Sequence, residues 1–163
     1  KLYNRSLRNY EKVIKYASRH KVKPVIEIHM GLITASAAAT AQFCSHFTPR
    51  QIGVIYDPGN MVYEGYEQYQ MGLEMLGKYL ANVHIKNSRW DVAGATRDRA
   101  VQWKPTFAPM KNGFVDFESL LRSLKAVGYD GWLSFEDFNT ALPADKKLPE
   151  DIKFLRKIER RIK

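Results

Sequence analysis

Three acidic residues and one histidine stand at matching places in four apolar segments of this sequence. Each lies within or at the end of a run rich in β-branched and aromatic residues, where an isolated charge is costly unless it is paired or bound to a metal. They are Glu27, Asp57, His84 and Glu136. Three carboxylates and one imidazole suit an oxygen-rich site for Mn²⁺, Mg²⁺, Co²⁺ or Zn²⁺. The pattern therefore predicts one divalent metal ion held by these four side chains.

Taken singly, these residues have ordinary explanations. A carboxylate at the end of a strand often caps the next helix, and a lone histidine is often a hydrogen-bonded core residue. Strand periodicity adds two neighbours, because His29 follows Glu27 by two residues and Lys86 follows His84 by two. Both are expected to face the same site and to bind substrate. His29 could orient a substrate hydroxyl or be a core histidine, and Lys86 could hold a substrate oxygen or phosphate or balance the carboxylates.

Strand-like and helix-like segments alternate along the chain. The strand-like segments are residues 22–30, 53–57, 81–87 and 131–138, and the helix-like segments are residues 2–20, 34–47, 65–80, 117–127 and 150–162. Strict alternation predicts right-handed βαβ units and a parallel sheet, and therefore an α/β fold. Sites in such folds form at the carboxyl ends of the strands. The length predicts a single domain over residues 1–163.

The composition is that of a globular protein with excess positive charge. Lys and Arg number 26 against 17 Asp and Glu, and the formal charge of +9 favours anionic partners such as phosphorylated sugars, sugar acids or nucleic acid. Basic residues concentrate modestly over residues 153–163, which is typical of a solvated helix face. The single cysteine, Cys44, excludes an internal disulfide, and no apolar run approaches the roughly 20 residues of a membrane span. We expect a cytoplasmic protein without a signal peptide or a membrane partner.

Residues 88–112 form the one long connection without a clear pattern, and we expect a loop there. It carries the basic and aromatic residues Arg89, Trp90, Arg97, Arg99, Trp103 and Lys104. Such a mixture can grip nucleic acid, or stack on a sugar and hold an anion, which makes Arg89 a candidate substrate-binding residue. The same composition also fits an ordinary lid, a mobile surface loop or a subunit contact.

Four stretches of the sequence resemble a known family in their order and spacing. They are IEIHMG, VIYDPGNMVYEG, LANVHIKNS and PMKNGFVDFESLLRSLKAVGYDGWLSFEDF. From about Leu7 to Ile162 the chain is similar to the last four βα units of the xylose isomerase-like TIM barrels. The resemblance implies a TIM (β/α)8 barrel of which this chain supplies strands 5 to 8 with their helices, a half barrel as it stands.

The resemblance also implies a chemistry. The family's metal ligands fall on the four residues named above, and in its isomerases and epimerases the residues equivalent to Glu27 and Glu136 move the proton. The implied function is a metal-dependent sugar or sugar phosphate isomerase/epimerase that moves a proton through a metal-bound enediolate. Asn60 occupies a place where several relatives carry a histidine that contacts substrate or metal. It is therefore a substrate-binding candidate, and a second metal is not expected.

Three alternatives remain open. An inosose-type dehydratase would use the same proton abstraction and then expel water. An endonuclease IV-like phosphodiesterase acting on DNA is favoured by the charge but opposed by the ligands, because no Asp-x-His occurs between Ser88 and Phe117. The chain could also be an inactive barrel fragment. Since four strands are half a barrel wall, we expect either a missing N-terminal half or closure with a second copy in a homo-oligomer, and a small sugar as the partner rather than nucleic acid.

Overall fold

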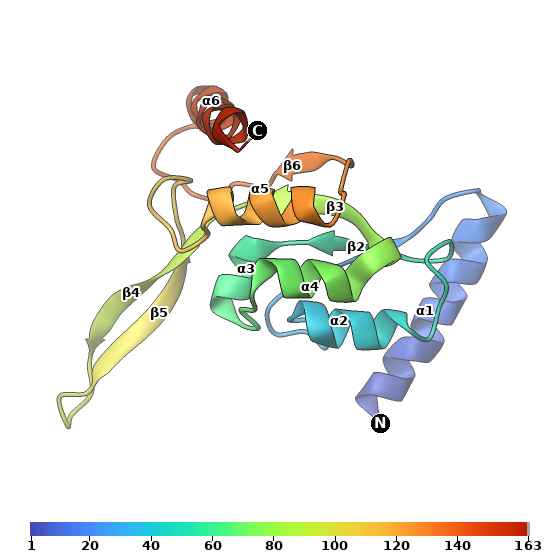
Figure 1. Cartoon of the computed structure of the whole chain (residues 1–163). Helices are drawn as coiled ribbons and strands as arrows, with labels where there is room; N and C mark the ends of the chain where they lie inside the picture. The colour runs from blue at the N-terminus through green and yellow to red at the C-terminus, as the bar shows by residue number, and fades with distance from the viewer. Residues whose placement is uncertain (163) are drawn as a thin grey trace.

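The computed structural model describes residues 1–162 and contains one parallel sheet, one antiparallel hairpin and seven helical segments (Figure 1). In chain order the elements are α1 (Leu2–Arg19), β1 (Val25–Glu27), α2 (Ala37–Cys44), β2 (Gly53–Tyr56), α3 (Pro58–Tyr63), α4 (Tyr69–Leu76), the 3-10 turn η1 (Gly77–Tyr79), β3 (Leu80–Ile85), β4 (Ser88–Ala95), β5 (Val101–Phe107), α5 (Phe117–Ala126), β6 (Leu133–Phe135) and α6 (Ala144–Arg161). None of the helices in this part of the chain combines the length and the apolar character that crossing a bilayer requires.

The main sheet has the strand order β1-β2-β3-β6, and every neighbouring pair is parallel. Helices α2, α4 and α5 lie side by side over one face of this sheet (Figure 1). Strand residues on that face are buried in one apolar cluster with residues of these helices; they are Ile26, Val54, Tyr56, Val83 and Ile85. The alternating βα order and the parallel sheet predicted from the sequence are therefore confirmed.

The strands are shorter than the sequence suggests. β1 covers three residues instead of the expected segment 22–30, and β6 covers three instead of 131–138. Beyond Glu27 the backbone folds back on itself, because the Thr34 hydroxyl donates to the Glu27 carbonyl and the His29 amide donates to the Thr34 carbonyl. The sheet ladder continues for one more bond, in which the Ile28 amide donates to the Ile55 carbonyl, and these local bonds replace it from His29 onward.

The expectation of an irregular loop over residues 88–112 is wrong. β4 and β5 pair antiparallel and form a long hairpin that projects away from the sheet (Figure 1). A turn closes it, in which the Ala100 carbonyl accepts from the Thr96 amide and Arg99 has a left-handed φ of +64°. The alternation of polar residues with Trp90, Val92, Val101 and Trp103 is the pattern of a two-stranded ribbon, but its basic residues hid it.

Two helix starts and one additional short helix also differ from the sequence prediction. The predicted helix over residues 65–80 is α4, which begins only at Tyr69, and the short helix α3 before it was not predicted. The last helix begins at Ala144 rather than at residue 150, so that Pro149 lies inside it. Proline in a helix removes one backbone hydrogen bond. Lys147 helps to hold this first part of α6, because its ammonium group binds the Asp137 carboxylate at 3.2 Å and the Asp137 carbonyl at 2.8 Å.

Candidate metal centre and proton-transfer site

Four adjacent parallel strands bring the four predicted ligands together where the carboxyl ends of the strands meet. We call this end of the sheet, with Glu27, Asp57, His84 and Glu136, the four-ligand edge. Glu27 ends β1, and His84 is the fifth residue of β3. Asp57 and Glu136 come directly after β2 and β6. The register pairs Glu27 with Ile55 and His84 with Ser134, so all four positions lie near the carboxyl ends of the strands. One potential ligand atom from each of the four lies within 4.8 Å of the others.

The imidazole of His84 stands where the three carboxylates converge. Its Nδ1 lies 3.1 Å from Glu27 Oε1, 3.1 Å from Asp57 Oδ2 and 3.4 Å from Glu136 Oε2. Burial lowers the pKa of His84, but hydrogen bonds to Asp57 and Glu27 and the charges of Asp57 and Glu136 outweigh it and raise the pKa to about 9. Three carboxylate oxygens therefore surround one nitrogen, and a divalent cation would neutralise their negative charge.

Lys86 supplies a second positive charge to the same cluster. Its side chain is 2% exposed, and its Nζ lies 2.6 Å from Glu136 Oε2, 3.1 Å from Asp57 Oδ2 and 2.9 Å from Asn60 Oδ1. Burial lowers the pKa of Lys86, but the charge of Asp57 and the bonds to both carboxylates outweigh it, so the pKa is raised. These contacts agree with the explanation that Lys86 balances the negative charge of the carboxylates.

Asp57 joins the site to the local fold. It is fully buried, and its Oδ1 accepts from the Asn60 amide at 2.8 Å as the N-cap of α3, while its Oδ2 faces His84 and Lys86. Pro58 occupies the first turn of α3, where its missing N–H is harmless. The next residue is Gly59, and a Cβ at this position would lie only 2.6 Å from the Lys86 side chain. The stretch Asp-Pro-Gly-Asn thus builds a helix start against the Lys86 stem.

The buried amide of Asn60 bridges two of these groups. Its Nδ2 donates to Glu27 Oε1 and to the Ile28 carbonyl, both at 3.1 Å, and its Oδ1 accepts from Lys86. Asn60 is fully buried, so every polar atom of its side chain is used within the protein. The contacts favour a role in orienting Glu27.

Comparison with known proteins identifies the family of this chain. The xylose isomerase-like TIM barrel family matches residues 1–158 of this chain. The chain belongs to that family.

Its relatives include inosose dehydratases and a rhizopine catabolism protein. The chain is 26% identical over 116 residues to an inosose dehydratase of Geobacillus thermodenitrificans, covering 66% of this chain and 38% of that protein. It is 30% identical over 123 residues to the rhizopine catabolism protein MocC of Rhizobium meliloti, covering 71% of this chain and 37% of that protein. The chain thus spans less than half the length of these relatives.

Solved structures share the fold. A xylose isomerase domain protein from Planctomyces limnophilus superposes with a TM-score of 0.74 at 21% identity, over 98% of this chain and 53% of that chain. A family protein from Mycobacterium smegmatis in complex with magnesium gives a TM-score of 0.69 at 15% identity, over 96% of this chain and 50% of that chain. The predicted xylose isomerase-like TIM barrel fold is confirmed, and the sheet described here corresponds to about half of such a barrel.

Two predicted substrate-binding residues of this family member lie apart from the four-ligand edge. His29 follows the end of β1, and its Nδ1 lies 2.8 Å from the carbonyl of its neighbour Met30. Arg89 lies at the base of the hairpin, where its Nε donates to Asp91 Oδ1 at 2.8 Å. Within residues 1–162, no ion pair or hydrogen bond joins either side chain to the four ligands. Their contact with substrate remains a prediction.

The sequence interpretation missed an aromatic wall beside Lys86. Phe107, at the end of β5, packs against Tyr63 of α3 and against Phe138, with ring centroids 5.5 and 5.2 Å apart. The Lys86 ammonium lies 5.5 Å from the Phe107 ring and 5.0 Å from the Phe138 ring. Phe107 escaped notice because residues 88–112 were expected to be a loop. The strand-like alternation leading into it would have revealed it.

Proposed function

We propose that this chain carries the metal and proton-transfer site of an isomerase or epimerase that acts on the ketone form of a sugar or sugar phosphate. The single observation that supports this function best is the convergence of four ligand atoms within 4.8 Å, with Glu27 and Glu136 on the two outer strands of the sheet. These two side chains are 28% and 31% exposed, whereas that of Asp57 is fully buried. Of the three carboxylates, solvent and hence a substrate can therefore reach Glu27 and Glu136 but not Asp57.

The donor set fits a divalent ion. Three carboxylates and one imidazole would hold it, and the chemistry it supplies when bound is Lewis-acid polarisation of a substrate carbonyl, which acidifies the neighbouring C–H bond. Glu27 or Glu136 would remove that proton and the other would return it. They extend from the ends of β1 and β6, on either side of the strand that carries His84, and this arrangement supports action from different sides of a substrate.

Neighbouring residues would tune the two glutamates differently. Lys86 donates to Glu136 at 2.6 Å, a charge-assisted hydrogen bond that holds the orientation of this side chain. Asn60 donates to Glu27 at 3.1 Å through a neutral amide, a weaker restraint. Because Glu136 is held by the Lys86 ammonium group, Glu27 is the candidate that we propose to abstract the proton first.

A dehydratase is the second candidate, because inosose dehydratases recur among the relatives. The first step would be the same removal of a proton next to a ketone. The second step would differ. The hydroxyl group on the next carbon, on the side of the deprotonated carbon away from the carbonyl, would leave as water after taking a proton from a carboxyl group. The same glutamates would serve both reactions, so the two candidates are separated by products rather than by the site.

The first experiment is metal analysis of the purified chain after exposure to Mn²⁺, Mg²⁺, Co²⁺ or Zn²⁺. We expect about one ion per chain, its loss in His84→Ala, and its retention in the control His20→Ala, because His20 is exposed at the end of α1. Equal metal content in both variants, or no metal in the unaltered chain, would contradict the four-ligand site.

The second experiment tests the reaction itself. Ketohexoses, their phosphates and inososes are incubated with the metal-loaded protein in D₂O, and products are followed by NMR. Solvent deuterium at the carbon next to the carbonyl, with a changed configuration or a shifted carbonyl, supports the isomerase or epimerase. Loss of water from an inosose supports the dehydratase. Glu27→Gln and Glu136→Gln should each abolish exchange while leaving the fold intact, and exchange that survives both substitutions would overturn the proposal.

A further inference from the structure

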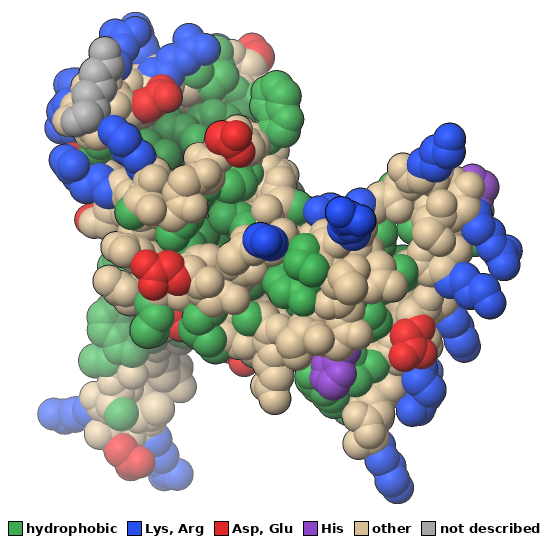
Figure 2. All heavy atoms as spheres, turned by 45° about the vertical axis from the view of Figure 1, so that its right-hand side comes forward, with side chains coloured by type: hydrophobic (Ala, Val, Ile, Leu, Met, Phe, Trp, Pro, Cys, Tyr) green, Lys and Arg blue, Asp and Glu red, His purple; other side chains and the backbone are tan. Residues whose placement is uncertain are grey.

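A basic groove lies along α6 and shares none of its lining residues with the four-ligand edge. It has a volume of about 610 Å³. Its rim carries Lys111, from the loop before α5, together with Lys153, Lys157 and Arg161 of α6. These four residues define the basic groove. Figure 2 shows Lys and Arg side chains gathered over the end of the molecule that carries this helix.

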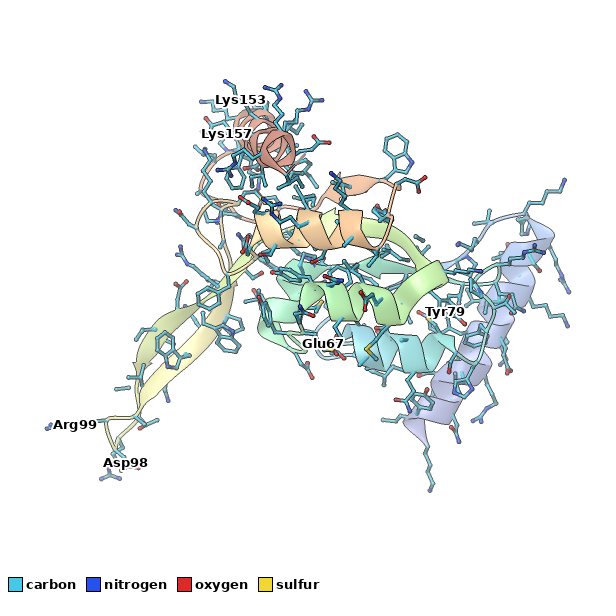
Figure 3. All side chains as sticks on the ribbon, viewed as in Figure 1. Glu67, Tyr79, Asp98, Arg99, Lys153 and Lys157 are labelled. Carbon is cyan, nitrogen blue, oxygen red and sulfur yellow. The ribbon has the colours of Figure 1, made fainter. Side chains whose placement is uncertain are left out.

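The three helical cations share one face of α6. They recur every four residues, so a rise of 1.5 Å per residue places successive side chains about 6 Å apart along the helix. Lys153 and Lys157 both project outward from α6 (Figure 3). The rim is therefore a row of charges roughly 12 Å long, with Lys111 added from the neighbouring loop.

Most of this positive charge is uncompensated. Within residues 1–162, no ion pair engages Lys111, Lys153 or Lys157. Arg161 lies 3.5 Å from Glu118, but that carboxylate is nearer to Arg122, at 2.8 Å. Glu150 is the one acidic residue that lines the groove. Four cations facing one carboxylate around a hollow create a field that favours an anion with several charges.

The floor of the groove is apolar and belongs to the core of the protein. Phe154 and Ile158 line it, and the Phe154 ring packs edge-on against Phe117 of α5 with centroids 6.2 Å apart. The Lys111 ammonium lies 5.7 Å from the Phe154 ring. Both walls thus come from described residues of this chain, and an apolar surface lies beneath the charged rim.

We propose that the basic groove binds a small organic phosphate ester that carries more than one phosphate group. One phosphate ester carries about 1.5 to 2 negative charges at neutral pH, so several such groups are needed to match the excess of cations. Their spread along the rim matches cations one helical turn apart. The organic part of the ligand would cover Phe154 and Ile158, and the volume is within the range of small-molecule pockets.

Calorimetric titration of the metal-free protein with inorganic triphosphate and with ATP tests this inference. The double variant Lys153→Gln/Lys157→Gln is compared with Lys12→Gln/Lys15→Gln, which removes the same charge from exposed positions of α1. We expect saturable binding to the unaltered protein, weakened about tenfold or more in the groove variant and less than about twofold in the control. All four lysines are exposed, so both variants should fold, which a thermal melt verifies.

Three results would overturn the inference. One is the absence of saturable binding of either probe at millimolar concentration. Another is equal weakening in the two double variants, which would mean that only net charge attracts the anion. The third is binding of a single-stranded oligonucleotide, lost in the groove variant, without binding of triphosphate or ATP, which would identify a nucleic-acid surface instead. Metal content should be the same in both double variants, so failure here leaves the function proposed above untouched.

Discussion

The β4–β5 hairpin lies in the chain between two residues of the four-ligand edge, His84 and Glu136, but the two regions are held together by opposite means. At the edge, residues from four strands form one buried polar network in which Lys86 and Asp57 are almost inaccessible to solvent. In the hairpin, each strand pairs only with the other, and Val92, Val101 and Trp103 are more than half exposed. The first region depends on contacts distant in sequence, and the second on contacts between near neighbours.

This difference has an energetic consequence. A buried charge that loses its partner has no water to replace it, so a single substitution at the edge exposes the full desolvation penalty. An exposed strand that loses a side chain keeps its backbone hydrogen bonds, and its remaining polar groups stay hydrated. Effects of mutation should therefore be large at the edge, intermediate where the hairpin meets the core, and small at its tip.

The largest effect is expected for Asp57→Ala. It leaves the Lys86 ammonium and the His84 imidazole short of a buried carboxylate and removes the N-cap of α3, so we expect a loss of about 3–5 kcal/mol in the free energy of unfolding. Urea denaturation measures it. Asp57→Asn keeps a cap oxygen and should cost less, and adding Lys86→Met to it should recover part of the loss. A change below about 1 kcal/mol in Asp57→Ala would contradict the network.

A buried carboxylate without an adequate partner should behave in the opposite way, and Asp151 provides the test. Its Oδ2 is buried without a hydrogen-bond partner. Burial and the nearby Asp137 carboxylate raise the pKa of Asp151 from 3.8 to about 6. The folded state therefore holds this proton more tightly than the unfolded state, so stability falls as pH rises between these two values.

Asp151→Asn mimics the protonated form at every pH. Because one pKa unit corresponds to about 1.4 kcal/mol, the variant should be more stable than the unaltered protein by on the order of 2 kcal/mol at pH 8. The advantage should vanish near pH 4. Melting temperatures across this range measure the difference, and a pH-independent difference between the two proteins would rule out titration of Asp151 as its cause.

Two tryptophans of the hairpin form a matched pair for an intermediate effect. Trp90 packs against the apolar core, and its Nε1 donates to the Val62 carbonyl at 2.8 Å, whereas Trp103 is 57% exposed. We expect Trp90→Ala to cost about 2 kcal/mol and Trp103→Ala less than about 0.5 kcal/mol. Chemical denaturation of both variants decides it. Equal costs would mean that the whole hairpin, rather than its base, is part of the folded core.

The smallest effect on stability is expected from breaking the hairpin tip. Arg97 and Arg99 lie in the exposed turn, so limited trypsin digestion should cut there first. The nicked protein should lose less than about 0.5 kcal/mol and keep its metal, because the tip contacts none of the four ligands. Mass spectrometry locates the cut. Initial cleavage within the parallel sheet would contradict the prediction that the tip is the most accessible segment. Loss of metal on nicking would show that the tip supports the four-ligand edge.

The sequence singled out residues that the structure brings together, whereas it missed some of the surrounding elements. Glu27, Asp57, His84 and Glu136 could be picked out because a charged residue in an apolar strand needs a chemical reason. The hairpin was missed because its exposed strands bury little apolar surface, and basic residues mask their alternation. His29 was assigned to the face of Glu27 on strand periodicity; β1 ends at Glu27, and contact of His29 with substrate stays a prediction.

By itself, the sequence determined the alternation of the four parallel strands with the helices between them and the residues with ligand chemistry, because these follow from local periodicity and from the cost of burying charge. Tertiary structure alone decided which groups meet. Only the packing of α3 against β3 places the Asn60 amide between Glu27 and Lys86. Only the path of β5 brings Phe107 over that lysine. Such contacts join residues more than 20 positions apart, and their geometry depends on strand register and helix position, which short-range patterns do not encode.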